Sequence, residues 1–161
     1  MSKKISESKS FLKDIGLPDS LQTDMASYVL LSLAHIQPDS DWKSATNEWL
    51  RIHDIREYIH HFYKKKYAEN TRETIRKNCI KPFREVALVE DNGKETNHPN
   101  FKYRLTPEAL NLIRAKESAS YRDDLSHFLD THEALIEKYK SQKEGSMKNP
   151  VGFRVSGRSA S

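Results

Sequence analysis

The sequence has only one cysteine, Cys79, and five glycines among its 161 residues. A single cysteine excludes an internal disulfide and any zinc site built from several cysteines, and it suits a reducing cytoplasm. So few glycines leave little room for a glycine-rich phosphate loop. No apolar run approaches the roughly 20 residues of a membrane span, and the N-terminal residues lack the apolar segment of a signal peptide. We therefore expect a soluble, cytoplasmic protein that does not enter a membrane.

Catalytic and metal-binding patterns are also sparse. The segments 18–19 and 41–43 formally fit the PD…DxK spacing of a metal-dependent nuclease, whose carboxylates stand on adjacent strands. The residues between these segments have a helical pattern, so we interpret the match as chance. The histidines lack carboxylate or cysteine companions at metal-ligand spacing. We expect no catalytic, cofactor-binding or metal-binding residue in this chain.

The charge is unevenly distributed along the chain. The net charge is +4, but the segment from Lys64 to Arg84 holds eight basic and two acidic residues, which leaves the rest of the chain at −2. A basic block on a slightly acidic body is typical of a surface that meets a polyanion. A lysine-rich helix face is often only a solvated face, so its position in the fold has to decide between the two interpretations.

Apolar spacing predicts helices in the first half of the chain, at about 10–16, 20–37 and 50–62. A fourth helix is predicted to begin at Asn70, because Glu73, three residues later, would complete a capping box. On a helical wheel, the apolar side chains of this helix share one stripe: Ile75, Cys79, Phe83 and Val86. Pro82 predicts a kink or an early end of the helix.

The second half of the chain begins with a predicted hairpin. Residues 86–90 and 101–105 have strand composition, and the loop between them contains an Asn-Gly turn signal. The Thr-Pro-Glu sequence at 106–108 gives three agreeing signals for the start of the next helix. A final amphipathic helix is predicted over about 120–139, with five apolar side chains inward: Leu125, Phe128, Leu129, Leu135 and Ile136.

This order of elements predicts a mainly α fold, a winged helix-turn-helix with a small two-stranded wing and a C-terminal helix. Residues 1–20 are expected to form an N-terminal tail and short helix, and residues 21–139 the winged helix-turn-helix domain. With 36% apolar residues, the chain can bury the core of one such domain. The apolar periodicity is lost after 140, so residues 140–161 are expected to form a flexible tail.

The predicted fold places the basic block on the second helix of the helix-turn-helix, which indicates binding to double-stranded DNA. The Asn, Thr, Lys and Arg side chains opposite the apolar stripe can donate to phosphates and to base edges in a major groove. The candidate DNA-binding residues of this helix are Asn70, Thr71, Arg72, Thr74, Arg76, Lys77, Asn78 and Lys81. In the hairpin loop, the candidates are Lys94, Asn97 and Lys102.

Two segments resemble a known family. The runs LRIHDIREYIHHFYKKKYAENTRETIRKNCIKPF and NHPNFKYRLTPEALNLIR are similar to the N-terminal helix-turn-helix domain of the BsuBI/PstI-like type II restriction endonucleases. The matching positions are Ile55, Arg56, Glu57, Ile59, Tyr67, Ala68, Asn70 to Thr74, Arg76, Asn97, Pro99, Tyr103, Pro107, Glu108, Leu110 and Arg114. Pro82 departs from the family pattern, which has a helix-compatible polar residue there.

The resemblance implies a sequence-specific DNA-binding domain of a restriction-modification system. The resemblance implies a further PD-(D/E)xK nuclease domain that needs Mg²⁺, because members of the family continue into one. Residues 140–161 are then either a flexible tail or the start of that domain, and the catalytic domain itself is expected to be missing from this chain. A second copy of the chain or a separate nuclease subunit is then a candidate partner, and whether the chain is part of an enzyme stays open. The alternatives are a stand-alone winged-helix transcription regulator, dimerising through the helix at 120–139, and a winged-helix protein-interaction module.

Overall fold

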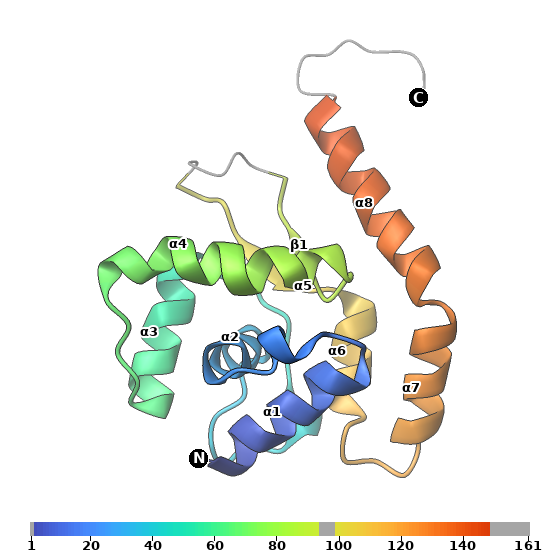
Figure 1. Ribbon diagram of the computed structural model, residues 1–161, viewed down its shortest axis with the longest axis horizontal. Helices are drawn as coiled ribbons and strands as arrows, with labels where there is room; N and C mark the ends of the chain where they lie inside the picture. Colours follow the sequence, from blue (N-terminus) through green and yellow to red (C-terminus); the bar gives the residue numbers. More distant parts are fainter. Residues whose placement is uncertain (1, 94–98, 149–161) are drawn as a thin grey trace.

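The computed structural model describes residues 2–93 and 99–148. Its elements are α1 (Ser2–Asp14), α2 (Asp24–Ala34), α3 (Ile52–Tyr63), α4 (Arg72–Ile75), α5 (Lys81–Glu85), β1 (Val89–Asp91), β2 (Tyr103–Leu105), α6 (Pro107–Arg114), α7 (Tyr121–Asp130) and α8 (His132–Lys148). Short 3₁₀ turns lie at Asp19–Leu21, Trp42–Ser44 and Glu69–Thr71, and Arg76–Ile80 form a π-helical segment between α4 and α5. Helix α2 lies at the centre and contacts α1, α3, α4 and the π-helical segment (Figure 1).

Helix α2 is central because it is apolar on nearly every side, as a core helix has to be. Thr23 caps its N-terminus by accepting a hydrogen bond from the backbone N–H of Ala26 at 3.1 Å. Its buried serines donate to backbone oxygens one turn earlier, Ser27 at 2.9 Å and Ser32 at 2.8 Å. These bonds satisfy both hydroxyls, so the helix can be buried without leaving either of these polar groups unsatisfied.

Helix α1 begins at Ser2 rather than near Ser10, where the apolar spacing predicts its start. Phe11 has no exposed surface and joins the core that surrounds α2. Upstream of it, Glu7 accepts a hydrogen bond from the indole N–H of Trp42 at 3.0 Å. Ile5 packs against the same core, so an apolar contact and a polar one extend the ordered helix upstream of its predicted start.

The predicted fourth helix is present, but its start differs from the prediction. Asn70 lies in a 3₁₀ turn, and the residue that caps α4 is Thr71, without a side-chain cap bond. Glu73 binds Arg76 instead of closing a capping box. The helix also does not end at Pro82, because α4, the π-helical segment and α5 follow one another without a break. We refer to these three segments together as the recognition helix.

A π-helical turn explains how the recognition helix contains a proline. Pro82 donates no backbone hydrogen bond, and in an α-helix its ring would clash with the carbonyl one turn earlier. The N–H of Lys81 bonds to the carbonyl of Arg76, five residues back, so the turn before the proline is wider than an α-turn. Cys79 and Ile80, which are neighbours in this turn, are both buried in the core.

The hairpin is confirmed, with shorter strands than predicted. Strands β1 and β2 pair antiparallel, with Val89 opposite Leu105 and Asp91 opposite Tyr103. Tyr103 also exchanges two backbone hydrogen bonds with Leu50, each of 2.8 Å. The apolar spacing assigns Leu50 to the third helix, whereas the structure uses it as an extra pairing partner at the edge of the wing.

The predicted last helix is in fact two helices, α7 and α8, which meet at Thr131. The Thr131 hydroxyl donates to the carbonyl of His127 at 3.0 Å, a side-chain bond that competes with regular helix. Leu129 is 43% exposed, so the prediction that it points inward is wrong. Helix α8 continues to Lys148, past the point where the apolar periodicity is lost. Helix α6 begins as predicted, with the Thr106 hydroxyl as its cap.

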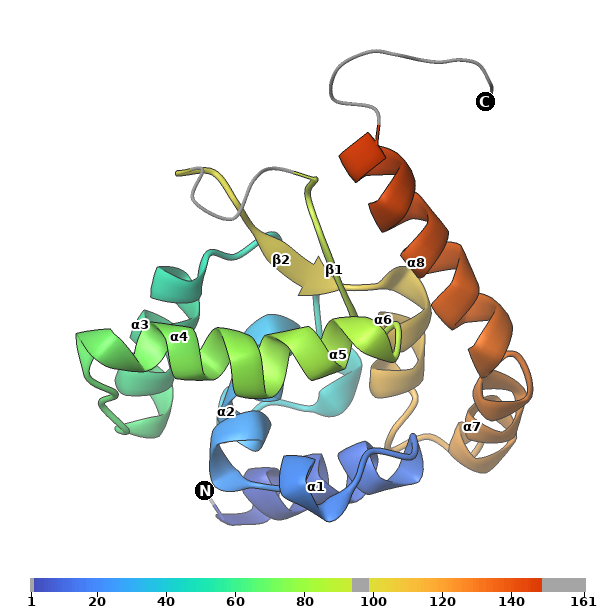
Figure 2. The ribbon, with the colours of Figure 1, turned by 45° about the horizontal axis from the view of Figure 1, so that its top comes forward.

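The predicted fold class is confirmed. The protein is mainly α, and α2, α3 and the recognition helix form a helix-turn-helix followed by the β1–β2 wing. Helices α7 and α8 rise beside this unit (Figure 2), and the His132 ring lies 2.7 Å from the backbone oxygen of Val86 at the end of the recognition helix. No helix in the described ranges combines the length and the apolar content needed to cross a membrane.

Candidate nucleic-acid interface

The turn between α3 and the recognition helix is held by Arg56. The Arg56 side chain is 12% exposed and donates from Nη1 to Oε1 of Glu69 at 2.9 Å and from Nη2 to the backbone oxygen of Tyr67 at 3.1 Å. Glu69 also pairs with Arg72 at 3.3 Å, in the first turn of the recognition helix. Because one planar guanidinium bridges the turn and the helix start, α3 positions the recognition helix directly.

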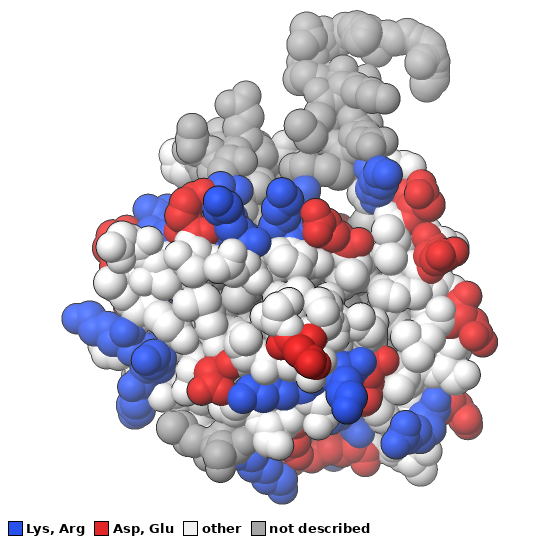
Figure 3. All heavy atoms as spheres, viewed as in Figure 1, with Lys and Arg blue, Asp and Glu red and all other residues white. Residues whose placement is uncertain are grey.

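The recognition helix separates its apolar and polar side chains. It buries four apolar side chains against the core: Ile75, Cys79, Ile80 and Phe83. Six of the predicted contact residues are exposed: Asn70, Arg72, Thr74, Lys77, Asn78 and Lys81. Thr71 and Arg76 are half-buried. Basic side chains, interrupted by acidic ones, line the upper edge of the molecule over this helix and the base of the wing (Figure 3).

Some charged side chains on this face form ion pairs with a neighbouring residue, and others do not. Arg76 donates to both carboxylate oxygens of Glu73, and this hydrogen bonding lowers the pKa of the Glu73 carboxyl below its usual range. Arg72 is likewise paired with an acid of the preceding turn. Lys77 and Lys81 form no hydrogen bond or ion pair with any described residue, and the positive charge of Lys77 acts on Glu73 only by helping to lower the pKa of that carboxyl. Their ammonium groups are therefore accessible to an external anion.

The wing was predicted to carry further contacts, and only part of it is described. Lys94 and Asn97 lie outside the described residues. Lys102 is half-buried, and its N–H donates to Oδ1 of Asn92 at 3.2 Å while its carbonyl accepts from the Asn92 N–H at 3.1 Å. Asn92 therefore closes the stem of the wing and holds Lys102 beside it.

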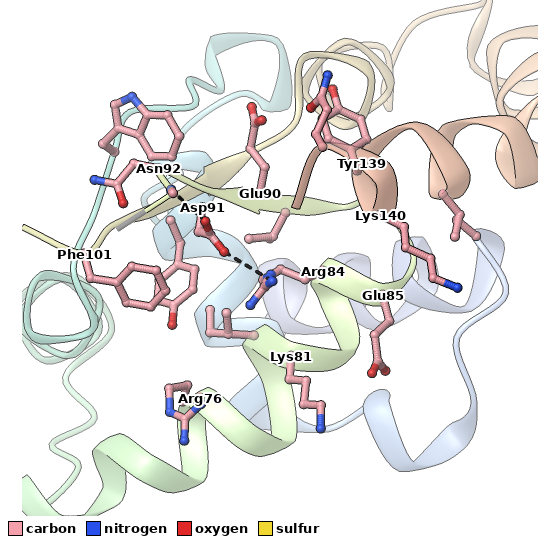
Figure 4. A pocket seen from close by; sticks show the side chains of 17 residues that line it. Arg76, Lys81, Arg84, Glu85, Glu90, Asp91, Asn92, Phe101, Tyr139 and Lys140 are labelled. Atoms are coloured by element: carbon pink, nitrogen blue, oxygen red, sulfur yellow. Dashed lines mark hydrogen bonds and ion pairs between the residues drawn. The ribbon is translucent and has the colours of Figure 1, made fainter. Parts of the chain in front are cut away.

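An ion pair that the sequence does not predict joins the wing to the recognition helix. Arg84 Nη2 lies 3.2 Å from Oδ2 of Asp91, whose side chain is only 3% exposed (Figure 4). The other carboxylate oxygen of Asp91 accepts the N–H of Gly93 at 2.8 Å. The helical wheel places Arg84 with the candidate contacts, whereas the structure uses it to fix the wing. A tight turn with Ala87 at φ 61° separates the partners, so no local spacing rule relates them.

Two clefts flank the wing along the recognition helix. The smaller cleft, of about 640 Å³, lies at the N-terminal half of the helix, and its basic lining residues are Arg51, His53, Arg72 and Arg76. The larger cleft, of about 1010 Å³, lies between α5, the wing and α8, and its basic lining residues are Arg76, Lys81, Arg84 and Lys140. Acidic side chains line both clefts as well, Glu69 and Glu73 in the smaller and Glu85, Glu90 and Asp91 in the larger, so that each has a small excess of basic lining residues.

The single cysteine of the chain, Cys79, lies buried beneath the recognition helix. Burial raises the pKa of the Cys79 thiol to about 12, which keeps it protonated near neutral pH. Across residues 2–93 and 99–148, no group of three or more His, Cys, Asp or Glu side chains is placed to hold a metal ion. The recognition helix presents ammonium, guanidinium, hydroxyl and amide groups, which can bind a ligand by donating hydrogen bonds to it.

Fold and surface together define a winged helix-turn-helix domain with a polar and partly cationic recognition helix. The chain belongs to the BsuBI/PstI restriction endonuclease HTH domain family, whose model matches residues 2–137. The resemblance inferred from the two sequence segments is therefore confirmed.

Known relatives of the chain are longer proteins. It is 30% identical over 146 residues to the type II restriction enzyme AplI of Arthrospira platensis, which covers 89% of this chain and 45% of AplI. It is 28% identical over 148 residues to the type II restriction enzyme BsuBI of Bacillus subtilis, covering 89% of this chain and 47% of BsuBI. The structure of SdaI restriction endonuclease has the same fold, with a TM-score of 0.75 at 22% identity over 86% of this chain and 44% of that chain. The chain thus spans a little under half the length of these relatives.

Proposed function

We propose that this chain is the sequence-specific duplex DNA-binding domain of a BsuBI/PstI-like type II restriction endonuclease. The observation that carries the proposal is the row of exposed donors on the recognition helix, where Lys77 and Lys81 form no hydrogen bond or ion pair with a described residue. The names of the relatives, type II restriction enzymes, support the same function. In this proposal, cleavage belongs to a Mg²⁺-dependent nuclease segment or subunit, and the present chain supplies recognition.

The proposed complex places the recognition helix in the major groove, whose width of about 12 Å admits an α-helix. Thr74, Lys77 and Asn78 then face the base edges, and Lys81 lies after the π-turn at the larger cleft. Lysine can donate to O6 and N7 of guanine, and asparagine can form a pair of hydrogen bonds with N6 and N7 of adenine. The remaining candidates contact the sugar-phosphate backbone: Asn70, Thr71, Arg72 and Arg76 from the helix start, and Lys94, Asn97 and Lys102 from the wing.

The proposal predicts an affinity for duplex DNA that falls steeply with salt, with a log–log slope near −0.9 for each phosphate neutralised. Fluorescence anisotropy of the full chain with a labelled duplex, between about 50 and 200 mM salt, measures this slope. Lys77→Ala should weaken binding by roughly tenfold if the lysine reads a base, and less if it meets a phosphate. Lys43→Ala is the matched control, because Lys43 is an exposed lysine of the turn Trp42–Ser44 and lines neither cleft.

Selection from a randomised duplex pool tests specificity. The wild-type chain should enrich one motif, and Asn78→Ala should lose the preference at one base pair, since a bidentate amide contact contributes roughly 1–3 kcal/mol of discrimination. A flat salt response, or equal affinity of Lys77→Ala and the wild type, contradicts the proposal. Binding to heparin without binding to any duplex would instead favour a module for an acidic protein partner.

A further inference from the structure

The larger cleft, of about 1010 Å³, has walls from three parts of the chain. The recognition helix contributes Lys81, Arg84 and Glu85, the wing contributes β1 and the start of β2, and α8 contributes Ile136 and Lys140 among others. Figure 4 shows Lys81 and Glu85 on one side of the opening and Lys140 on the other, with Arg84 turned toward the wing. Helix α8 is therefore part of the same concave surface as the recognition helix.

Most charges that line the larger cleft are already neutralised. Arg84 is paired with Asp91 at 3.2 Å, and Glu90 is paired with Arg104 at 2.9 Å. Arg76 is paired with an acid of its own helix. An anion that enters the cleft could bind these arginines only by displacing their acidic partners. The paired groups therefore contribute little to the attraction of an anionic ligand.

Three charged side chains of the lining have no hydrogen bond or ion pair with any residue in the described part of the chain. They are Lys81 and Glu85 on the recognition helix and Lys140 on α8, and all three are exposed. One uncompensated cation thus stands on each of the two helices, and one uncompensated carboxylate stands beside Lys81. The available charge is positive, which favours an anionic occupant.

Lys140 is held toward the cleft by the contacts of its neighbours. The Tyr139 hydroxyl donates to Oε1 of Glu108 on α6 at 2.6 Å, and the Lys138 ammonium donates to Oε2 of the same carboxylate at 3.1 Å. These bonds fix the rotation of α8 about its axis. Lys140 follows Ile136 by four residues and so lies on the same side of the helix, which faces the cleft.

We propose that α8 is a third DNA-contacting element and that Lys140 binds a backbone phosphate of the strand lying in the larger cleft. This inference rests on the proposed function and adds α8 to the surface that contacts DNA. A helix seated in the major groove has a sugar-phosphate backbone on either side. The wing flanks the recognition helix, and α8 rises beside its C-terminal end in both views (Figures 1 and 2), so a duplex seated on Lys77 and Lys81 brings one strand toward α8.

The shape of the larger cleft favours a strand over a small anion. Pockets for small ligands enclose roughly 300–1,000 Å³ and bury most of the ligand behind converging polar groups. Here Lys81 and Lys140 stand at the rim and do not point toward one common position (Figure 4). Separated cations along an open groove match the repeated charges of a nucleic-acid backbone.

The test compares three variants of the full chain in the salt-dependent anisotropy assay. Lys140→Ala should lower duplex affinity about fivefold at low salt and reduce the magnitude of the salt slope by about 1, the loss of one phosphate contact. Lys43→Ala, the control of the first assay, removes the same charge from an exposed turn that lines neither cleft and should stay within about twofold of the wild type. Glu85→Gln removes the uncompensated carboxylate and should raise affinity about twofold to fivefold without changing the sequence motif.

Ethylation interference on the bound duplex gives a second measurement. The wild type should show phosphates whose ethylation blocks binding, and one of these positions should lose its effect in Lys140→Ala. If Lys140→Ala keeps both the slope and the interference pattern while Lys77→Ala weakens binding, α8 is outside the interface and only this inference fails. If the wild-type chain does not bind duplex DNA, the proposed function fails together with it. Equal losses in Lys140→Ala and Lys43→Ala would show a general charge effect and also overturn the assignment to Lys140.

Discussion

Breaking the Arg84–Asp91 ion pair is expected to release the wing from the recognition helix. The Asp91 side chain is 3% exposed and the Arg84 side chain 28% exposed, so both charges stand largely out of water. Removal of one partner leaves the other, largely buried charge without its ion pair, which is costly in a protein interior. Loss of one partner is therefore expected to cost more than in the exposed ion pairs of the same helix, which are worth roughly 0–1 kcal/mol.

The size of the effect follows from distance and burial. Two unit charges 3.2 Å apart attract by about 5 kcal/mol at an effective dielectric constant of 20. Desolvation of the buried carboxylate offsets a large part of this attraction, and the partial exposure of Arg84 screens it further. We expect a coupling free energy between the two side chains of about 2 kcal/mol.

A double-mutant cycle measures that coupling. Arg84→Met keeps the aliphatic stem, and Asp91→Asn keeps an oxygen that can accept the N–H of Gly93. Urea unfolding of the wild type, both single variants and the double variant gives four free energies of unfolding. Each single variant should be destabilised by about 2–3 kcal/mol, and the double variant by clearly less than the sum. Additivity within about 0.5 kcal/mol would refute the pairing.

The DNA affinities of the same variants separate positioning from charge. Arg84→Met removes a positive charge and Asp91→Asn removes a negative one, so a purely electrostatic role predicts opposite changes in affinity. If the pair acts by holding the wing in place, both variants weaken binding to a duplex. Tighter binding by Asp91→Asn would show that the wing needs no such anchor.

Three further outcomes are expected. Glu73→Gln should bind duplex DNA about twofold to fivefold more tightly at low salt in the anisotropy assay, because it frees Arg76 and removes a negative charge from the helix face. Burial alone would raise the pKa of the Glu108 carboxyl, but hydrogen bonds, chiefly from Tyr139, lower it overall. At pH 7 the wild type should therefore have a free energy of unfolding about 1–2 kcal/mol higher than that of Glu108→Gln. In urea titrations this difference should vanish as the pH falls below the ordinary value of 4.5 and through the lowered pKa. Cys79, buried and with its pKa raised to about 12, should react with a thiol reagent at pH 8 only at the rate at which the domain opens.

Local patterns in the sequence were enough to predict the elements that carry the interface. The recognition helix follows from apolar residues spaced by four, and the start of α6 follows from the cap at Thr106 and the proline after it. These local patterns agree with the structure because each relates residues within one helical turn of each other. The same reasoning explains why six polar candidates of the recognition helix are exposed in the structure.

Features that depend on distant contacts could not be predicted in this way. The pairing of Leu50 with Tyr103 joins residues far apart in the chain, and neither position has a pattern that requires it. The bridge from Arg56 to Glu69 crosses the turn of the helix-turn-helix, where spacing rules for helices do not apply. The break between α7 and α8 falls at Thr131, inside a stretch whose apolar periodicity predicts one continuous helix.

The recognition helix shows how one local rule, applied correctly, can mislead. Pro82 indicates a break, and a wheel of 100° per residue leaves Ile80 off the apolar stripe, yet Ile80 is 1% exposed and the helix continues. Both discrepancies have the same cause, because a π-turn adds a residue and shifts everything after it by roughly 100° relative to the α-helical wheel. Arg84, which the wheel aligns with Lys77, is thereby turned toward Asp91 and the wing. The first half of the helix therefore keeps its predicted polar face, whereas the π-turn rotates the second half, with Lys81 and Arg84, toward the larger cleft, where α8 stands.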